Sequence, residues 1–482
     1  MAKFYITNAI PYVNAKPHIG HALEFVQSDV INRYHKIIGD QTLFLCGGDE
    51  NALKNVQAAE KANVNVQEFV DKNSELFLDL SKKLNIGFDV FQKGSNAKHY
   101  SSSQKLWELC NKNGDIYKKS YTGLYCVGCE LFYEKEELDQ NGECFEHSGK
   151  KLEEVTEENY FFKLSRYTEK ITKIITSNEI EIIPENRKNE VLAFLKQGLK
   201  DISISRSNER AKNWGVPVPN DPSQRMYVWF DALNIYQSGV GFGADEVLYK
   251  KWWPADVHVI GKGILRFHAI YWPAFLLSAG LSLPKSIFVH EYITVNGQKM
   301  SKTLGNVIDP IGLIDKYGAD GLRFYFLKHL SPFSDGDFSE DKFKKAFNAD
   351  LANGLGNLVS RLAKLCENSN HTQTGSEKRS SSHIIEIELY SKALSEYRFN
   401  EALNFVWKKI EDLNHFIDQE KPWDLIKNNN PKIKNVLSHG IDQIQEIAAL
   451  LEPFLPETAK KIESQFKGPK IVSNPSLFPR IK

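Results

Sequence analysis

Residues 4–46, FYITNAIPYVNAKPHIGHALEFVQSDVINRYHKIIGDQTLFLC, contain two strand-like runs with a helix-like run between them. Phe4–Ile10 predicts a buried strand, the segment from about His18 to Ile38 predicts a long helix, and Thr42–Cys46 predicts a second strand. A strand, a helix and a strand in this order open a parallel α/β sheet. Such sheets bind their ligands beyond the carboxyl ends of the strands, where the first loop enters the helix.

The pattern of residue types changes along the rest of the chain. From Gly114 to about Ile204, paired cysteines, many charges and short runs replace the strand–helix alternation, which predicts an insertion. Strand-like and helical segments resume at Tyr227–Trp229, Val257–Ile260 and Ile287–His290. After about Phe347 the apolar residues recur at spacings of three and four, which predicts helices only. The sequence therefore predicts an α/β domain with an insertion, followed by an all-α region.

The composition is that of a folded protein with several domains. Lys+Arg and Asp+Glu balance at 61 each in 482 residues, so nucleic acid would have to be bound by local patches or by shape. A hydrophobic content of 41% can fill several cores. We see neither a signal peptide nor an apolar run of membrane-span length. Six cysteines do not make a disulfide scaffold, and we expect a cytoplasmic protein without membrane contact.

Two histidines mark the start of the first predicted helix. In Pro17-His18-Ile19-Gly20-His21 they are three residues apart and share one helical face. Backbone N–H groups and the positive end of the helix dipole favour phosphate at such a start. Gly20 would let a flat base lie against the backbone, because it has no Cβ. These five residues alone leave open the alternative of capping or surface histidines.

A second basic motif, Lys299-Met300-Ser301-Lys302-Thr303, lies far downstream in a loop that contains glycine. Two lysines on a loop could hold the β- and γ-phosphates of ATP and neutralise charge as pyrophosphate leaves. Taken alone, such a motif is more often an ordinary solvated basic loop.

Four soft ligands occur in two short-spaced pairs. Cys126-x-x-Cys129 is followed by Cys144-x-x-His147, a spacing that suits tetrahedral Zn²⁺ in a closed, structural site. Four protein ligands leave no open position on the metal, so we assign the zinc no catalytic role. The alternative is four unrelated residues, which the regular spacing disfavours.

The two basic motifs, in this order and on an α/β background, resemble the HIGH and KMSKS signatures of class I aminoacyl-tRNA synthetases. Within that class the chain resembles the methionyl-tRNA synthetases, from Phe4 to the closing Leu477-Phe478-Pro479-Arg480. The segments that carry this specific resemblance are TNAIPYVNAKPHIGHALEF, WFDAL, GKGILRFHAIYWPAF, VNGQKMSKT, LANGLGNLVSR and EKPW.

The resemblance implies a methionine–tRNA ligase, which forms methionyl-adenylate from ATP and methionine and transfers the methionyl group to tRNA. It implies that His18 and His21 stabilise the α-phosphate, and that Lys299 and Lys302 hold the leaving pyrophosphate together with Mg²⁺. Methionine's own carboxylate is the nucleophile, so the protein contributes position and charge. The ATP-binding positions that it implies are His18, Gly20, His21, Gly261, Lys299, Ser301 and Lys302.

The family's amino-acid pocket corresponds to nine positions of this chain: Ile10, Tyr12, Asp49, Trp229, Ala232, Leu233, Tyr236, Ile264 and His268. Aromatic rings suit a thioether, and the Asp49 carboxylate suits the substrate ammonium. Tyr12 and His268 are polar enough to contact the sulfur or to close the pocket. The four positions from 229 to 236 fall at helical spacing, which by itself is more often typical of a protein core.

The helical C-terminal region corresponds to the family's anticodon-binding domain. Asn353, Asn357 and Arg361 are spaced by four and project from one helical face, from which amides and a guanidinium can read unstacked bases. Trp423, preceded by Pro422, can stack on one base of a CAU anticodon. The alternative is a polar solvent face with a Trp that plugs the bundle. The implied partners are ATP, L-methionine and tRNA(Met), including the initiator tRNA, and we expect a monomer.

The implied architecture is a Rossmann-like class I catalytic domain with a zinc-knuckle insertion and an all-α anticodon-binding bundle. Its expected parts are 1–113 and 206–292 for the halves of the catalytic domain, 114–205 for the insertion, 293–346 for the KMSKS loop and stem-contact region, and 347–482 for the bundle. The insertion is too short to hold both a knuckle and the editing domain of the isoleucine, valine and leucine enzymes.

Two places depart from the family pattern. Asp49-Glu50-Asn51-Ala52 stands where the family usually has Asp-Glu-His-Gly, and Gly261-Lys262-Gly263 stands where it usually has Gly-Lys-Asp. The carboxylate missing at Gly263 removes one expected contact to the adenosine side of ATP. These departures are the only support for an alternative, a synthetase-derived binding protein without efficient ligase activity. Another class I ligase, such as the cysteine enzyme, conflicts with the aromatic pocket and the helical anticodon residues.

Overall fold

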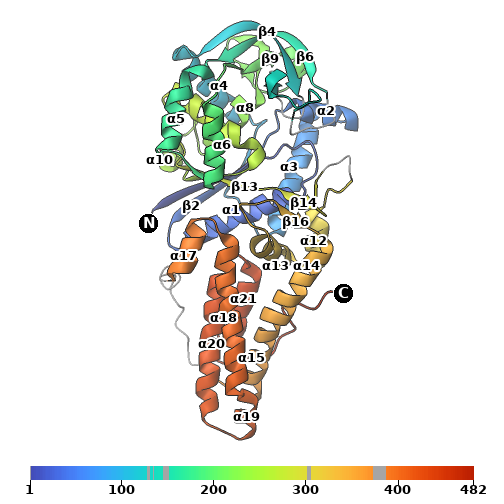
Figure 1. Cartoon of the computed structure of the whole chain (residues 1–482), viewed down its shortest axis with the longest axis vertical. Coiled ribbons are helices and arrows are strands. Elements are labelled where there is room, and N and C mark those ends of the chain that lie inside the picture. Colours follow the sequence, from blue (N-terminus) through green and yellow to red (C-terminus); the bar gives the residue numbers. More distant parts are fainter. Residues whose placement is uncertain (1, 127–130, 134, 145–150, 301–304, 373–386) are drawn as a thin grey trace.

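The computed structural model describes residues 2–126, 131–133, 135–144, 151–300, 305–372 and 387–482. Figure 1 shows an α/β part built around a sheet, and a bundle of long helices that extends away from it. Within these described ranges, no helix has both the length and the apolar character that a membrane crossing needs.

A six-stranded parallel sheet forms the centre of the α/β part, in the order β3-β2-β1-β12-β13-β7. Its strands are β1 (Lys3–Asn8), β2 (Gln41–Gly48), β3 (Val90–Lys93), β7 (Glu181–Ile183), β12 (Val257–Gly261) and β13 (Ser286–His290). The order reverses between β1 and β12, and the carboxyl ends beside such a reversal form the ligand crevice of parallel α/β folds. The predicted opening of strand, helix and strand is confirmed.

Helix α1 (Ile19–Ile37) connects β1 to β2 and is buried over most of its length. Phe25, Val26 and Val30 have no exposed surface, since they belong to a core that continues from the sheet into the helical bundle. The helices that follow β2 and β3 are α2 (Leu53–Ala62), α3 (Val66–Lys83) and α4 (Ala97–Lys112). The first loop of the sheet, residues 9–18, runs between two buried elements, β1 and α1, which fix both of its ends.

The insertion consists mainly of an antiparallel sheet in the order β5-β4-β6-β8. Its strands are β4 (Ile116–Cys126), β5 (Leu131–Tyr133), β6 (Glu153–Phe162) and β8 (Ile202–Ser203), and helices α5 (Thr168–Thr176) and α6 (Glu185–Leu195) precede β8. The limits 114–205 need one refinement. Strand β7 lies within them, yet it pairs in parallel with β13 as the edge strand of the central sheet. Three residues, Glu-Ile-Ile, are too short a run to show this in the sequence.

The second half of the catalytic domain carries short elements around the sheet. They are β9 (Ser205–Ser207), α7 (Asn208–Ala211), β10 (Pro217–Val218), β11 (Asp221–Met226), α8 (Val228–Ala232), α9 (Ile235–Ser238), α10 (Glu246–Trp252) and α11 (Trp272–Ala279). The segment that resumes at Tyr227–Trp229 is the start of a helix, because Tyr227 is the N-cap of α8, which begins at Val228. A π-helical turn at Phe267–Tyr271 leads into α11.

A small sheet and two helices connect the catalytic domain to the bundle: β14 (Ile293–Val295), β15 (Gln298–Lys299), α12 (Pro310–Tyr317), α13 (Ala319–Phe324) and β16 (Gly336–Phe338). The helices of the bundle are α14 (Glu340–Ala346), α15 (Asn357–Asn368), α17 (Glu388–Ser395), α18 (Phe399–Glu420), α19 (Pro422–Lys427), α20 (Lys432–Leu451) and α21 (Pro456–Phe466), and a π-helical segment, Phe347–Gly356, joins α14 to α15 (Figure 1). The all-α C-terminal region is therefore confirmed.

One buried guanidinium joins the two parts of the molecule. Arg323 of α13 has no exposed surface and donates to the carbonyls of Leu84, Pro453 and Phe454 at 3.1, 3.0 and 2.7 Å. It also pairs with Asp29 of α1 at 2.8 Å. A charge buried this deeply is costly unless its donors are satisfied, so its four partners fix the bundle relative to the catalytic sheet.

Candidate active site

A cavity of about 490 Å³ lies at the carboxyl ends of β1, β12 and β13. Nine of the residues that the sequence assigned to ATP or methionine line it: Ile10, Tyr12, His18, Gly20, His21, Trp229, Gly261, Ile264 and Lys299. They come from segments more than 280 residues apart in the chain. The place is the crevice beside the reversal of strand order, where the sheet topology predicts a ligand.

His18 and His21 form a reciprocal cap at the start of α1. Nδ1 of His18 accepts from the N–H of Gly20, and Nδ1 of His21 accepts from the N–H of His18, both at 3.1 Å. A neutral ring that accepts at Nδ1 carries its proton on Nε2, so these bonds define the tautomer. The capping role is therefore observed, and it is compatible with Nε2–H groups that donate to a phosphate.

The structure gives a steric reason for a glycine at position 20, which is the nearby ring of His18. A Cβ at this position would lie 3.0 Å from Cε1 of His18 and 3.6 Å from the methyl group of Met300. The space beside the glycine is thus filled by the imidazole of His18 and is not an open platform for a base. Any side chain here would displace the capping ring.

The basic loop reaches the cavity through its first lysine. Lys299 ends the short strand β15, which pairs with β14, and its ammonium lies 5.7 Å from the ring centroid of Tyr292. Lys299, Met300 and Tyr292 all line the cavity. The other two positions assigned to ATP on this loop, Ser301 and Lys302, lie outside the described residues.

The aromatic wall of the cavity is held by stacking. Trp229 lies on Phe267 with a centroid separation of 3.7 Å and an angle of 5°, and Tyr12 meets Trp229 edge-on at 6.1 Å. Of the other pocket positions, Ile10 and Ile264 line the cavity. Ala232, Leu233, Tyr236 and His268 are buried in the wall behind Trp229 and do not line it. Their burial thus places them in the core that supports the pocket.

His268 is a neutral, oriented ring within this wall. Its Nδ1 lies 2.9 Å from the carbonyl of Ile264, to which it donates, and its Nε2 accepts from the hydroxyl of Tyr236 at 2.8 Å. Burial lowers the pKa of His268 to about 4. Burial also raises the pKa of Tyr236 well above its ordinary value. The polar groups of this wall are therefore uncharged at neutral pH, which suits an uncharged thioether.

Asp49 is buried next to the cavity mouth, although it does not line the cavity. Its N–H donates to the carbonyl of Pro11 at 2.9 Å, and a parallel bridge pairs it with Tyr12. Asn55 donates to the Asp49 carbonyl at 2.8 Å. The backbone of this carboxylate is thus fixed beside the wall that Tyr12 forms.

Several cavity residues were missed by reasoning from the sequence. Glu24 of α1 accepts from the amide of Asn8 at 2.7 Å and lies 2.9 Å from Nε2 of His290, so it joins the carboxyl ends of β1 and β13. His290 had a detectable signal, because it ends a predicted strand at the edge where ligands bind. Lys16, the exposed cation of the first loop, had none beyond its charge.

A network of charges surrounds the place where a carboxylate is missing. Glu291 lines the cavity together with Gly263, and it is paired with Lys262 at 2.8 Å and with Arg187 of α6. Lys262 also binds Asp335 at 2.6 Å. The cavity wall at Gly263 therefore retains an acidic side chain, although it comes from the end of β13.

Two of the four predicted zinc ligands lie together. The Sγ atoms of Cys126 and Cys144 are 3.2 Å apart, and both residues are buried. Thiolates on a tetrahedral zinc with bonds of about 2.3 Å lie about 3.8 Å apart, whereas a disulfide bond measures about 2.05 Å. The observed separation is too long for a disulfide bond and shorter than that of two zinc-bound thiolates, so it shows that the two thiols are neighbours. Cys129 and His147 lie outside the described residues.

The predicted anticodon residues belong to the bundle: Asn353 lies in a π-helical segment (Phe347–Gly356), Asn357 and Arg361 on α15, and Pro422 and Trp423 on α19, which Figure 1 shows at the far end of the bundle from the sheet. Trp423 keeps 42% of its surface exposed, and the guanidinium of Arg361 lies 5.2 Å from its ring centroid. Arg361 also pairs with Asp418. Trp423 is therefore not enclosed by the bundle.

The other three residues of this set differ in their surroundings. Asn357 is exposed at the start of α15, and Pro422 is buried as the first residue of α19. Asn353 is exposed but accepts from Nε of Arg480 at 2.8 Å, a contact with the end of the chain. Asn353 and Asn357 are thus exposed, whereas Arg361 is half-buried.

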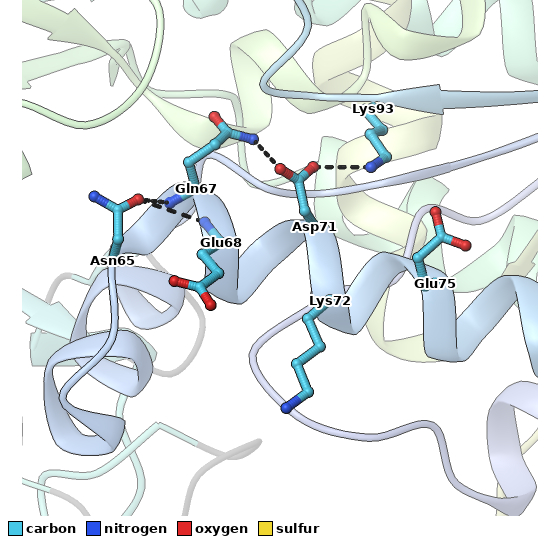
Figure 2. A pocket seen from close by; sticks show the side chains of 7 residues that line it. All are labelled: Asn65, Gln67, Glu68, Asp71, Lys72, Glu75 and Lys93. Carbon is cyan, nitrogen blue, oxygen red and sulfur yellow. Dashed lines mark hydrogen bonds and ion pairs between the residues drawn. The ribbon is translucent and has the colours of Figure 1, made fainter.

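A second hollow lies on the outer face of α3, lined by Asn65, Gln67, Glu68, Asp71, Lys72, Glu75 and Lys93 (Figure 2). Asp71 pairs with Lys93 at 2.8 Å and accepts from Gln67 at 3.1 Å. The Asn65 side chain caps α3. Asp71, Lys93 and Gln67 thus bind one another, and none of the predicted site residues contributes to the hollow.

Comparison with known proteins identifies relatives over the whole chain. Residues 4–363 match the family model of tRNA synthetases class I (M). The methionine–tRNA ligase of Thermotoga maritima is 40% identical over 472 residues, which cover 95% of this chain and 74% of the relative. That of Rhizobium meliloti is 39% identical over 471 residues, which cover 95% of this chain and 90% of the relative.

Solved structures agree with these relatives. A structure of Mycobacterium tuberculosis methionyl-tRNA synthetase in complex with methionyl-adenylate matches with a TM-score of 0.92 at 35% identity, and the match covers 100% of both chains. The apo form of that protein matches with a TM-score of 0.84 at 32% identity, over 100% of this chain and 99% of the other. The similarity therefore includes the helical bundle as well as the sheet.

Proposed function

This chain belongs to the class I tRNA synthetases of the methionine type, and from that membership we propose which of its residues carry out each step. It is a methionine–tRNA ligase that converts L-methionine and ATP to methionyl-adenylate and transfers the methionyl group to tRNA. One observation supports the assignment of residues. Two capping histidines, a signature lysine and a stacked aromatic wall face one cavity at the switch point of the sheet.

Adenylate formation takes place at the start of α1. A methionine carboxylate oxygen attacks the α-phosphorus, the new O–P bond forms, and the bond to pyrophosphate breaks. The Nε2–H groups of His18 and His21 donate to the α-phosphate oxygens, whose charge must be stabilised in the transition state. Lys299, Ser301 and Lys302 hold the leaving pyrophosphate. Mg²⁺ that arrives with ATP supplies further positive charge at the β- and γ-phosphates.

Methionine binds between the carboxylate of Asp49 and the aromatic wall. Asp49 accepts the substrate ammonium in a charge-assisted bond. Tyr12 and Trp229 contact the thioether, for which aromatic rings offer favourable sulfur contacts. The neutral His268 keeps the rear wall uncharged, so a lysine or glutamate side chain would lose its hydration there without gaining a partner.

The adenosine moiety lies at Gly261, whereas Gly20 serves ATP binding indirectly, because it leaves room for the His18 ring. Glu24 and Glu291 are the carboxylates of this region and offer acceptors for ribose hydroxyls where Gly263 has none. We place them on the ribose side because both line the same cavity as the two glycines.

One structural zinc is held by Cys126, Cys129, Cys144 and His147. The proximity of the first and third of these sulfurs supports this proposal. The metal stabilises the fold around the insertion's antiparallel sheet and takes no part in adenylate chemistry.

Anticodon recognition takes place at α15 and α19. Trp423 stacks on a base of the CAU anticodon, and Asn353, Asn357 and Arg361 donate to base edges. The partner is tRNA(Met), including the initiator tRNA. We further propose that the enzyme acts as a monomer in the cytoplasm, where its product enters translation.

Amino-acid-dependent ATP–pyrophosphate exchange tests the function across a panel of the standard amino acids. We expect fast exchange with methionine alone. A better rate with leucine or isoleucine would contradict the pocket assignment. Binding of methionine without any exchange would instead favour the synthetase-derived binding protein.

A further inference from the structure

Asn51, one of the departures from the family pattern, makes a bond that connects two walls of the proposed methionine pocket. Its Nδ2 donates to Oδ2 of Asp231 at 2.6 Å and to the carbonyl of Gly94 at 2.9 Å. Its Oδ1 accepts from the hydroxyl of Tyr100 at 3.2 Å. Asn51 is 9% exposed and Asp231 is 2% exposed, so water competes little for these bonds.

Both carboxylate oxygens of Asp231 accept hydrogen bonds in this arrangement. Its Oδ1 lies 2.7 Å from Nε2 of His99 and accepts from the hydroxyl of Ser103 at 2.9 Å. Nδ1 of His99 in turn lies 2.7 Å from the hydroxyl of Ser238. The carboxylate thus has two donors on one oxygen and the Asn51 amide on the other. Removal of that amide would take the hydrogen bond from Oδ2 of the buried Asp231, at a cost in free energy.

The bond between Asn51 and Asp231 joins segments that are far apart in the sequence. Asn51 lies two residues after Asp49, the proposed acceptor of the substrate ammonium. Asp231 lies two residues after Trp229, the proposed wall for the thioether. Helix α8 has only five residues, Val228–Ala232, so its own backbone bonds are few and its position depends on contacts such as this one.

We propose that Asn51 is a positioning residue that sets the separation between the Asp49 carboxylate and the Trp229 ring, and thereby the affinity for methionine. This inference rests on the proposed methionine pocket. Asn51 touches neither substrate in this arrangement and acts through Asp231. Its loss therefore affects methionine binding selectively, because the ATP side of the cavity is built on α1, β12 and β13.

The test compares Michaelis constants in pyrophosphate exchange for wild type and three variants. Asn51→Ala should raise KM for methionine by about tenfold and leave KM for ATP within about twofold, since one charge-assisted bond is lost at the pocket. Asn51→Asp should be worse, because it brings a second carboxylate against Asp231. In the exchange Asn51→Asp with Asp231→Asn, the new amide can donate to the new carboxylate while Oδ1 keeps His99 and Ser103. It should recover part of the loss relative to Asn51→Asp, since the link to residue 231 is restored while the Gly94 carbonyl still lacks the donor that Asn51 supplies.

Tyr100→Phe is the matched control. It removes the bond to Oδ1 of Asn51 but leaves the link to α8, so KM for methionine should stay within about twofold of wild type. Three results would overturn the proposal: an equal rise of both Michaelis constants, a lower thermal stability with unchanged constants, or an exchanged pair no better than Asn51→Asp. A wild-type protein without methionine-dependent exchange would instead refute the proposed function, and the two failures are therefore distinguishable.

Discussion

The imidazole rings of His18 and His21 stack with their centroids 3.8 Å apart at the first turn of α1. The same two side chains cap the helix through their Nδ1 atoms. A pair that caps through Nδ1 presents Nε2 as its remaining donor, so helix capping orients the groups proposed to act on phosphate. Replacement of either histidine by alanine would therefore mix a loss of helix stability with a loss of chemistry.

His21→Asn separates these effects. The asparagine Oδ1 can take the place of Nδ1 as the acceptor for the His18 N–H, so the cap should survive and the free energy of unfolding should fall by less than about 1 kcal/mol. The Nε2–H donor is lost, and methionine-dependent exchange should slow by about two orders of magnitude or more. Exchange kinetics and urea denaturation of the same preparation measure both quantities.

His21→Ala provides the comparison. It should show the same loss of exchange together with a loss of stability of about 1 kcal/mol from the missing cap. Exchange at the wild-type rate in His21→Asn would mean that the histidine serves the helix alone.

The zinc proposal predicts one tightly bound Zn²⁺ per chain. Cys126→Ser should abolish it, because the metal requires a complete set of soft ligands. The matched control is Cys110→Ser, since Cys110 is also buried and its thiol contacts the carbonyl of Phe275 at 3.5 Å. Elemental analysis measures the metal content. Full zinc content in Cys126→Ser, or none in wild type, would exclude the site.

Chelation extends the same prediction to activity. Removal of zinc should destabilise the insertion more than the nucleotide site, because the two proposed ligands within the described residues, Cys126 at the end of β4 and Cys144 after β5, both belong to the insertion. Exchange without tRNA should therefore persist in part after chelation. Its complete loss would mean that the metal supports the catalytic centre itself.

The opening of the fold was predictable because its signals are local. An apolar run at Phe4–Ile10, a helix start at His18 and a second run at Thr42–Cys46 each depend on neighbours in the sequence. The confirmed helical region after Phe347 depends on a period of three to four residues. The two basic motifs indicated the family because they occur in a fixed order in a chain with an α/β pattern.

Other features depend on contacts between distant residues, which a single sequence does not show. Strand β7 joins the central sheet only because Ile182 pairs with Ile287 of β13. The reason for Gly20 is the position of the His18 ring, a matter of side-chain orientation. In the sequence, Asn51 was only a difference from the family's Asp-Glu-His-Gly segment. The structure shows its bond to Asp231, which lies 180 residues away in the chain. Long-range partners of this kind account for most of what was missed.

Stability should depend on pH through His268. Burial lowers its pKa from 6.5 to about 4, so between these values the unfolded chain binds a proton that the folded chain does not. The free energy of unfolding must therefore fall as the pH falls through this range. Between pH 7.5 and pH 5 the contribution of His268 is about 2 kcal/mol. In His268→Gln this part of the pH dependence should disappear.

Urea denaturation at the two pH values measures the effect. His258 is shifted in the same direction, well below its ordinary pKa, and remains in both proteins, so a smaller slope should persist in the variant. His415→Gln, which removes an exposed ring on α18, controls for the loss of a histidine as such. An identical slope in wild type and His268→Gln would contradict the assignment of this proton.

Replacement of Trp423 should lower the aminoacylation of tRNA and leave adenylate formation nearly unchanged. Stacking on an aromatic side chain is typically worth about 1–3 kcal/mol per base, so Trp423→Ala should lower aminoacylation efficiency at least about tenfold. Exchange without tRNA should be nearly unchanged, because α19 lies at the far end of the bundle from the cavity (Figure 1). Leu389→Ala, which also removes an exposed apolar side chain, is the control and should alter neither assay. Equal losses in charging and exchange would mean that Trp423 supports the fold, and no loss in either would exclude it from the anticodon site.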